Sequence, residues 1–266
     1  MNAKRLVKSF VTGLRVKLLA ANPAIVRWYY LKLWKPQPGS FVEFLDRFSR
    51  QNEGIFFIQV GSNDGIQHDP LYKFIKRDRW KGIMMEPQKT AFSKLSYAYP
   101  KGNVHLVNKA ISDNNEPKKL YKIAFTDQRW ASGISSFLRQ HVEDRIADGH
   151  VDRQCKKYGI IPPENKEDYI TYDEVECINF PTLLKEFAVK KVDLLHIDTE
   201  GFDYEVIKLF DFNLFKPRVV AFEHTHLSDA DYRSCKQYLT ELGYDLTFFD
   251  ADTVAVQGGR WPERKA

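Results

Sequence analysis

Two segments of the chain place polar residues directly after an apolar run. Residues 55–60 form the first run, which passes into Gly61, Ser62, Asn63, Asp64 and Gly65. A second run, Gly82–Met85, ends in the carboxylate of Glu86. In a doubly wound sheet, a glycine turn after one buried strand and an acid after the next hold a nucleoside, because the acid accepts hydrogen bonds from the ribose hydroxyls. The pattern therefore predicts a nucleoside-binding site.

The spacing inside the glycine turn narrows the choice of nucleoside. Gly61 and Gly65 stand as G-x-x-x-G, whereas a dinucleotide site needs G-x-G-x-x-G so that a helix N-terminus can approach the pyrophosphate. Asp64 would repel a pyrophosphate but would suit a ligand with an ammonium group. S-adenosyl-L-methionine has a ribose, an amino-acid tail and no phosphate, so we expect it as the cofactor, with the N–H groups of the loop on its carboxylate. The alternative is an ordinary turn between a strand and a helix.

Polar residues also follow the later strands. Ser112 and Asp113 follow the third strand and are expected at the adenine edge, unless they form a simple turn. Asp198 and His224 follow the fourth and fifth strands, where ligands of open α/β sheets bind, and are the candidate catalytic bases. Glu200 either belongs to the same site or only caps the next helix. We expect four residues to contact an acceptor molecule: Trp130, Ser132, Ser135 and His226.

A divalent metal ion is a further possibility at these strand ends. Oxygen-rich ligands would suit magnesium, and the candidates are His196, Asp198, Glu223, His224 and His226. Their spacing does not indicate a metal site, so no metal is predicted. His196 lies inside the fourth strand and is interpreted as a structural or orienting residue.

The charge of the chain is concentrated at its N-terminus. Residues 1–42 contain lysine and arginine but no acid and carry +8, against +5 for all 266 residues, which leaves −3 for the rest. This distribution argues against a nucleic-acid groove across the domain. The three cysteines, Cys155, Cys177 and Cys235, form no C-x-x-C pair, which favours a reduced, cytoplasmic setting.

Residues 1–39 are predicted to be a basic, amphipathic, helical N-terminal segment. Apolar residues recur at helical spacing with cations between them over 4–20, and an aromatic patch follows over 28–34. One interpretation is a helix that packs on the domain. The other is a peripheral contact of residues 1–35 with the inner face of a membrane.

Strands and helices alternate from residue 40 onward. Ser40 and Glu43 form a capping box at the first helix. We predict strands over 55–60, 82–86, 104–111, 118–124, 192–198, 218–223, 244–249 and 253–257. We predict helices over 70–77, with Asp69 and Pro70 at its start, and over 89–98, 204–210 and 229–242, the last between Ser228 and Gly243.

This alternation predicts an α/β fold of the Rossmann-like class I methyltransferase type. It has a mostly parallel seven-stranded sheet, a final antiparallel strand and helices on both faces. The final strand is antiparallel because residues 250–252 are too few for a parallel crossover. The domain would span 40–260, with a lid or substrate region inserted at about 126–176 and a charged helix over 137–158.

Several blocks of this sequence resemble the FkbM family of S-adenosyl-L-methionine-dependent methyltransferases. They are VNKAISDN (107–114), VDLLHIDTEGFDYEVIK (192–208) and VVAFEH (219–224), within a resemblance that runs from about 56 to 256. His196 departs from it, because many relatives carry lysine there. The resemblance implies methyl transfer to the hydroxyl of a sugar, a polyketide macrolide or another small molecule.

The preferred hypothesis is O-methylation of a sugar hydroxyl in a glycan or glycolipid precursor. A macrolide-type or other small-molecule acceptor stays open within the same reaction class. Two hypotheses from different classes also stay open: a non-catalytic nucleoside-binding module and a methyltransferase of RNA or protein. No nucleic-acid partner is predicted, since the fourth-strand block contains no N-P-P-Y-like motif.

Overall fold

A sheet of seven strands forms the centre of the computed structural model, which describes residues 23–100 and 102–258. Its strands are β1 (Phe56–Val60), β2 (Lys81–Met85), β3 (Val104–Val107), β8 (Leu194–Ile197), β9 (Val219–Glu223), β10 (Tyr244–Phe249) and β11 (Asp252–Gln257). They lie in the order β10-β11-β9-β8-β1-β2-β3, and β11 pairs antiparallel with both of its neighbours. The other neighbours are parallel. The predicted Rossmann-like fold, with one antiparallel strand in a mostly parallel sheet, is confirmed.

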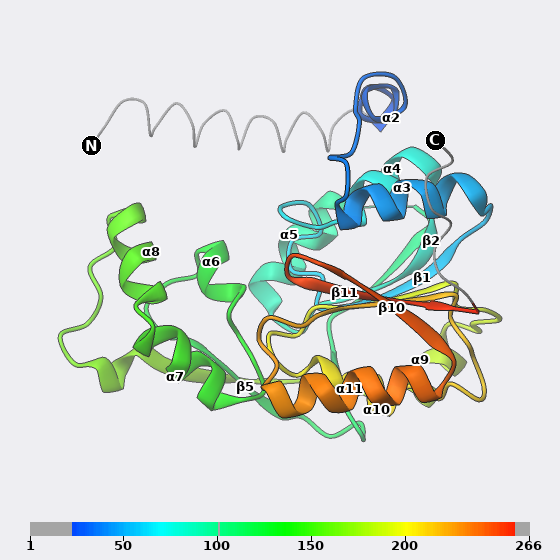
Figure 1. Cartoon of the computed structure of the whole chain (residues 1–266). Coiled ribbons are helices and arrows are strands. Elements are labelled where there is room, and N and C mark those ends of the chain that lie inside the picture. Colours follow the sequence, from blue (N-terminus) through cyan, green and yellow to red (C-terminus); the bar gives the residue numbers. More distant parts are fainter. Residues whose placement is uncertain (1–22, 101, 259–266) are drawn as a thin grey trace.

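The central strands are apolar because helices cover both faces of the sheet. On one face lie α3 (Phe41–Gln51), α4 (Tyr72–Asp78) and α5 (Lys89–Ala98). On the other face lie α9 (Phe180–Glu186), α10 (Asp203–Leu209) and α11 (Asp229–Glu241). Figure 1 shows these two helical layers above and below the sheet.

The parallel register brings the ends of three strands together. Val60, the last residue of β1, pairs with Met85 of β2 on one side and with Ile197 of β8 on the other. The residues that follow these strands are Gly61, Glu86 and Asp198, so they meet at one edge of the sheet.

The predicted helix caps are present at α3 and α11. The side chain of Ser40 accepts a hydrogen bond from the N–H of Glu43, and that of Ser228 accepts one from the N–H of Asp231. The predicted start of α4 was wrong: this helix begins at Tyr72 rather than Pro70. Asp69 Oδ1 accepts a hydrogen bond from Leu71 N at 2.7 Å, so residues 69–71 form a turn ahead of the helix.

Two of the predicted strands lie wholly or partly outside the central sheet. The segment 104–111 is not one strand, because β4 (Ala110–Ile111) leaves the sheet after β3 and pairs with β7 (Cys177–Ile178). The segment 118–124 forms β5 (Lys118–Ile123), which pairs antiparallel with β6 (Ile170–Val175) in a separate two-stranded sheet. The elements β6, β7 and α9 were not predicted, since β7 is very short and β6 is polar along much of its length.

The segment between β5 and β6 carries its own small hydrophobic core. It contains α6 (Arg129–Ser132), α7 (Arg139–Ala147), α8 (His150–Tyr158) and the 3₁₀ helix η1 (Lys166–Tyr169). Val142, Val151 and Cys155 are buried together within this insertion. It projects to one side of the domain in Figure 1. The charged helix predicted over 137–158 is two helices, because Gly149 takes a left-handed conformation between them.

The helix α2 (Pro23–Lys32) lies beside α4 at the N-terminal end of the described chain. Arg27 Nε donates to Arg77 O at 2.9 Å, and the Tyr30 ring lies edge-on to that of Tyr72. Trp28 and Leu33 remain exposed. The predicted helix over 4–20 lies outside the described residues. Among the described helices, none is both long enough and apolar enough to span a bilayer.

Candidate active site

A cavity opens at the carboxyl ends of β1, β2, β8 and β9. Each of these strands, or the residue directly after it, contributes to the wall: Gly61, Glu86, Asp198 and Glu223. The remaining wall comes from the segment after β3 and from the insertion between β5 and β6. The cavity is therefore where an open α/β sheet is expected to bind its ligand.

Gly61 allows two strand ends to touch. Its φ angle is +84°, and a β-carbon at this position would overlap the backbone carbonyl of Asp198. The N–H groups of Gly61 and Ser62 both donate to Met85 O, at 3.1 and 2.9 Å. Asp198 N donates to Val60 O at 2.9 Å. These bonds fix β1, β2 and β8 relative to one another at the wall of the cavity.

Glu86 is buried, and its carboxylate is oriented by backbone N–H groups. Oε2 accepts from Asn63 N at 2.9 Å and Oε1 accepts from Gln88 N at 2.8 Å. Burial nevertheless raises the pKa of Glu86 to about 7, because the loss of hydration outweighs these bonds. Each oxygen keeps a further lone pair, and the residue lines the cavity, so the carboxylate can accept two hydroxyl hydrogen bonds.

Asp64 turns into its own loop instead of lining the cavity. Its Oδ1 accepts from the N–H groups of Ile66 and Gln67, both at 2.9 Å. Most N–H groups of the glycine turn are also used internally, including that of Gly65, which donates to Ser62 O at 2.8 Å. The sequence-based prediction that this loop offers an acid to an ammonium group and N–H groups to a carboxylate was therefore wrong in this geometry.

Arg129 supplies a positive charge that sequence reasoning missed. It lies on α6, lines the cavity, and its Nη2 donates to Gln67 O at 2.6 Å. Its Nε lies 3.5 Å from Asp64 Oδ2. Asp64 and Gln67 thus hold the guanidinium in place at the cavity wall. The sequence contains no signal for this role, because Arg129 follows a polar loop of irregular spacing.

The segment after β3 lines the cavity with residues other than those predicted. Ser112 and Asp113 are outside the wall: Ser112 Oγ donates to Asp113 Oδ1 at 2.8 Å, and Asp113 pairs with Lys118 at 2.6 Å. Ala110 and Ile111 line the cavity instead. Their apolar surfaces suit the face of a flat ring.

The insertion is tied to the Glu86 side of the cavity through serine side chains. Asn63 Nδ2 donates to Ser132 Oγ at 3.3 Å, and Ser135 Oγ donates to Gln88 Oε1 at 3.2 Å. Both serines line the cavity, and their contact with an acceptor stays a prediction. Trp130 does not: it packs inside the insertion, with its ring 6.3 Å from that of His150.

Acidic residues gather at the opposite side of the cavity. Asp198, Glu200 and Glu223 all line it. Asp198 is accessible from the cavity, but the surrounding protein reduces its hydration, and this loss, followed by the charges of Glu223 and Asp252, raises its pKa above the usual range. The pKa of Glu200 is also raised, first by burial and then by the charge of Asp198. This side is thus strongly acidic, and it is unfavourable for all of its carboxyl groups to be ionised at once.

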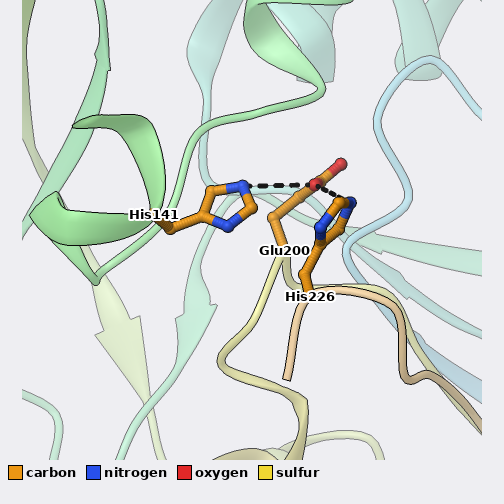
Figure 2. A group of neighbouring side chains, drawn as sticks. All are labelled: His141, Glu200 and His226. Atoms are coloured by element: carbon orange, nitrogen blue, oxygen red, sulfur yellow. Dashed lines mark ion pairs between the residues drawn. The ribbon is translucent and has the colours of Figure 1, made fainter. Parts of the chain in front are cut away.

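The histidines at the strand ends occupy three different environments. His224 does not line the cavity, because its Nδ1 lies 3.0 Å from Thr253 Oγ1 and its ring stacks on Tyr232. His196 stacks on Phe41, within the helical layer of α3. His226 Nε2 lies 3.3 Å from Glu200 Oε2. His141, which comes from α7 and was not predicted, joins them with its Nε2 at 3.5 Å from the same oxygen (Figure 2).

Comparison with family models shows where the chain belongs. The model described as "Methyltransferase FkbM domain" matches residues 59–246, well over half of the chain. The protein is a member of the FkbM methyltransferase family. It is accordingly an S-adenosyl-L-methionine-dependent methyltransferase, as the strand blocks indicated. None of the curated proteins matches the chain in sequence.

Several solved methyltransferase structures are similar to this FkbM protein at low identity. Aeropyrum pernix fibrillarin with natively bound S-adenosyl-L-methionine is 11% identical, with a TM-score of 0.38 over 77% of this chain and 67% of that one. A SAM-dependent O-methyltransferase from Thermotoga maritima is 10% identical (TM-score 0.41; 90% and 73%). Precorrin-6y C5,15-methyltransferase from Geobacter metallireducens is 12% identical (TM-score 0.39; 85% and 91%). At these values the likeness bears on neither substrate nor mechanism.

The cavity of this FkbM methyltransferase fits S-adenosyl-L-methionine. Glu86 offers acceptors for the two ribose hydroxyls, and Ala110 and Ile111 offer an apolar wall for the adenine. Arg129 offers a cation for the methionine carboxylate. The absence of a side chain at Gly61 lets the ends of β1 and β8 lie against each other in the cavity wall.

Proposed function

We propose that this FkbM methyltransferase is an O-methyltransferase that acts on a sugar hydroxyl of a glycan or glycolipid precursor. The carrying observation is the chemistry of the cavity wall opposite Glu86, where Asp198, Glu200 and Glu223 meet. Carboxylates accept hydrogen bonds from hydroxyls and would be costly to bury against an apolar acceptor. Such a wall favours an acceptor rich in hydroxyl groups.

Within this proposal the residues divide between holding the cofactor and handling a proton. Bound S-adenosyl-L-methionine supplies an electrophilic methyl group. Glu86 holds the ribose hydroxyls, and Arg129 holds the carboxylate. Asp198 belongs to the acidic wall of the same cavity and follows β8, the neighbour of β1, and it accepts the proton that the acceptor hydroxyl loses. His224, the second base predicted from the sequence, has no access to the cavity wall in this arrangement.

A small-molecule acceptor of macrolide type is the second candidate. Phe137 and Phe202 both line the cavity, and their rings meet edge to face at 5.3 Å. This apolar surface would pack against a hydrocarbon skeleton while the acidic wall receives its hydroxyl. The same surface would also pack against the face of a sugar ring.

The outer surface of α2 supports a working position next to a membrane. Trp28, Leu31 and Leu33 are exposed on or directly after this helix, among the cations Arg27, Lys32 and Lys35. Exposed aromatic and aliphatic side chains with neighbouring cations suit the interface of an anionic bilayer. A peripheral contact there would keep the enzyme close to lipid-linked glycan precursors.

The test is methyl transfer to a set of acceptors by wild type and Asp198→Asn. We expect wild type to methylate a sugar-containing acceptor in preference to a macrolide. We expect Asp198→Asn to lower kcat by about 10²- to 10⁴-fold with nearly unchanged affinity for S-adenosyl-L-methionine. Asp245→Asn on the exposed side of β10 is the matched control. Preference for the macrolide would contradict the proposed substrate class. Full activity of Asp198→Asn would contradict the role of Asp198 as the base.

A further inference from the structure

Two imidazole rings and a carboxylate converge where the insertion meets the strand ends. His141 Nε2 and His226 Nε2 lie 3.5 and 3.3 Å from one oxygen, Glu200 Oε2. Figure 2 shows both rings directed at this carboxylate from opposite sides. The three residues come from α7, from the loop after β9 and from the loop after β8, so three separate parts of the chain meet at one point.

The separations between these atoms are those of neighbouring ligands around a metal ion. For bonds of about 2.1 Å, the edge of a coordination tetrahedron is about 3.4 Å. The observed 3.3 and 3.5 Å agree with this edge and exceed the ~2.9 Å of an ordinary N–H···O hydrogen bond. His141 is 8% exposed, and its Nε2 has no hydrogen-bond partner. A buried ring nitrogen without a partner is costly, and an ion would satisfy it.

The backbone around Glu200 is built to present its side chain at this point. Glu200 takes a left-handed conformation, with φ of +54°, which is unfavourable for a residue with a β-carbon. The carboxylate of Asp203 accepts from Thr199 N and Gly201 N, at 3.4 and 3.3 Å, and so holds the turn on both sides of Glu200. Strain maintained in this way is typical of a functional site.

The carboxylates next to the cluster form no direct ion pair with a lysine or arginine among the described residues, although Arg129 and Arg145 act on them from a longer distance. Asp198, Glu200 and Glu223 can bring one oxygen each within 4.8 Å of one another. Over residues 23–100 and 102–258, no lysine or arginine lies within ion-pair distance of any of the three. Three carboxylates at a cavity wall without a direct ion pair to a lysine or arginine favour a divalent cation as a counter-charge.

We propose that His141, Glu200 and His226 bind a divalent transition-metal ion such as Mn²⁺ or Zn²⁺ next to the cavity, which Glu200 itself lines. Asp198 and Glu223 lie on the cavity side of these ligands and add negative charge. Imidazole nitrogen combined with carboxylate oxygen suits these ions better than Mg²⁺, which prefers oxygen ligands alone.

An ion at this position would give the site a way to hold its acceptor. If the acceptor is a hydroxyl compound, as the proposed function holds, a hydroxyl oxygen would bind the ion directly. The positive charge would lower the pKa of that hydroxyl and fix its position next to Asp198. Because His141 belongs to the insertion and Glu200 follows the central sheet, the ion would also hold the insertion against the domain.

The experiment measures metal binding to the full-length chain after treatment with EDTA and dialysis. MnCl₂ is titrated while the signal of free Mn²⁺ is followed by electron paramagnetic resonance, and ZnCl₂ and MgCl₂ are titrated by calorimetry. We expect one Mn²⁺ or Zn²⁺ per chain, with Mg²⁺ bound more weakly. His141→Gln and His226→Gln should each weaken Mn²⁺ binding at least tenfold. His105→Gln, at an exposed position on β3, is the matched control and should bind as wild type does.

Thermal unfolding of each metal-free variant shows whether it is folded. If the double variant His141→Gln/His226→Gln is folded, its metal binding is compared with that of the control. Wild type that takes up no stoichiometric Mn²⁺ or Zn²⁺, or folded glutamine variants that bind as tightly as wild type, would overturn the proposed metal site. Methyl transfer to a hydroxyl in the presence of EDTA, without metal binding, would overturn it while leaving the proposed function intact. Stoichiometric metal and cofactor binding without transfer to any hydroxyl would support the metal site and count against O-methylation.

Discussion

The α-carbon of Gly61 packs against the backbone carbonyl of Asp198, so that the cofactor turn and the candidate base are in direct contact. A β-carbon at Gly61 would overlap that oxygen, and the φ angle of +84° is unfavourable for alanine as well. We therefore expect Gly61→Ala to lose more than about 3 kcal/mol of unfolding free energy, measured by urea denaturation. Calorimetry should detect no cofactor binding.

Gly54 offers a matched control for this substitution. Its φ angle is +60°, but nothing lies within 4 Å of a β-carbon built there. Gly54→Ala should therefore lower the unfolding free energy by only about 1–2 kcal/mol, because alanine is less stable in the left-handed conformation. The variant should bind the cofactor normally. Equal losses for the two variants would show that close packing at Gly61 has no special importance.

Glu86→Gln tests the ribose contact. The carboxamide keeps the shape of the side chain, but its NH₂ group would face Asn63 N or Gln88 N, which are donors themselves. One hydrogen bond is lost and a donor is left unsatisfied, so affinity for S-adenosyl-L-methionine should fall about 10- to 100-fold in calorimetry. Glu116→Gln, at an exposed position, is the control. Unchanged affinity of Glu86→Gln would exclude Glu86 as the ribose ligand.

Arg129→Ala distinguishes the two ends of the cofactor. If Arg129 binds the methionine carboxylate, the variant should lose about tenfold or more in affinity for S-adenosylhomocysteine. It should bind 5′-methylthioadenosine, which has no carboxylate, as wild type does. A parallel loss for both ligands would mean that Arg129 acts on the shape of the cavity through Gln67 and Asp64.

Asp69 should make stability depend on pH. Burial raises its pKa from 3.8 to about 6, because the loss of hydration outweighs the bonds from Leu71 N and the Gln59 side chain. The folded state then binds more protons than the unfolded state between about pH 4 and 6, so this residue makes unfolding free energy fall as pH rises through that window. A rise of about two pKa units corresponds to a change of about 3 kcal/mol in unfolding free energy across the window.

The measurement is urea unfolding of wild type and Asp69→Asn from pH 4 to pH 7. Between pH 4 and pH 7 the unfolding free energy of the variant should rise by about 3 kcal/mol relative to that of wild type, since asparagine cannot ionise. Asp245→Asn, on the exposed side of β10, corrects for a general change in charge. Parallel curves for wild type and Asp69→Asn would refute the raised pKa.

The exposed side of α2 can be tested with lipid vesicles. Trp28 is 55% exposed and Leu33 is 60% exposed, so Trp28→Ser/Leu33→Ser should leave unfolding free energy nearly unchanged. Sedimentation with vesicles that contain anionic lipid should nevertheless show about tenfold weaker binding. Tyr97→Ser removes a similarly exposed ring from α5 and should bind as wild type does. No binding of wild type to such vesicles would contradict the membrane contact.

The sheet and its strand-end residues could be predicted from the sequence because their physical causes are local. Buried parallel strands must be apolar on both faces, and ligands bind beyond their carboxyl ends. Gly61, Glu86 and Asp198 follow from these two rules alone. Their convergence in one cavity required only that the strands be neighbours.

Residues from the insertion could not be predicted in the same way. Arg129 reaches the cavity and His141 reaches Glu200 because of how α6 and α7 pack, and no period in the sequence encodes that packing. The predictions that Asp64 and Ser112 bind the cofactor were wrong for a different reason. Each has a partner within three residues along the chain, and such local hydrogen bonds form more readily than contacts with a distant ligand.

The insertion owes its stability to its own core around Val142 and Val151 rather than to the core of the central sheet. Among the residues that the structure describes, the two cores have no buried member in common. Substitutions in the insertion can therefore accumulate with little effect on the strands that carry Gly61 and Glu86. A family built in this way can evolve new acceptor preferences in the insertion while selection preserves Gly61 and Glu86 in the sheet and, within the insertion, Arg129.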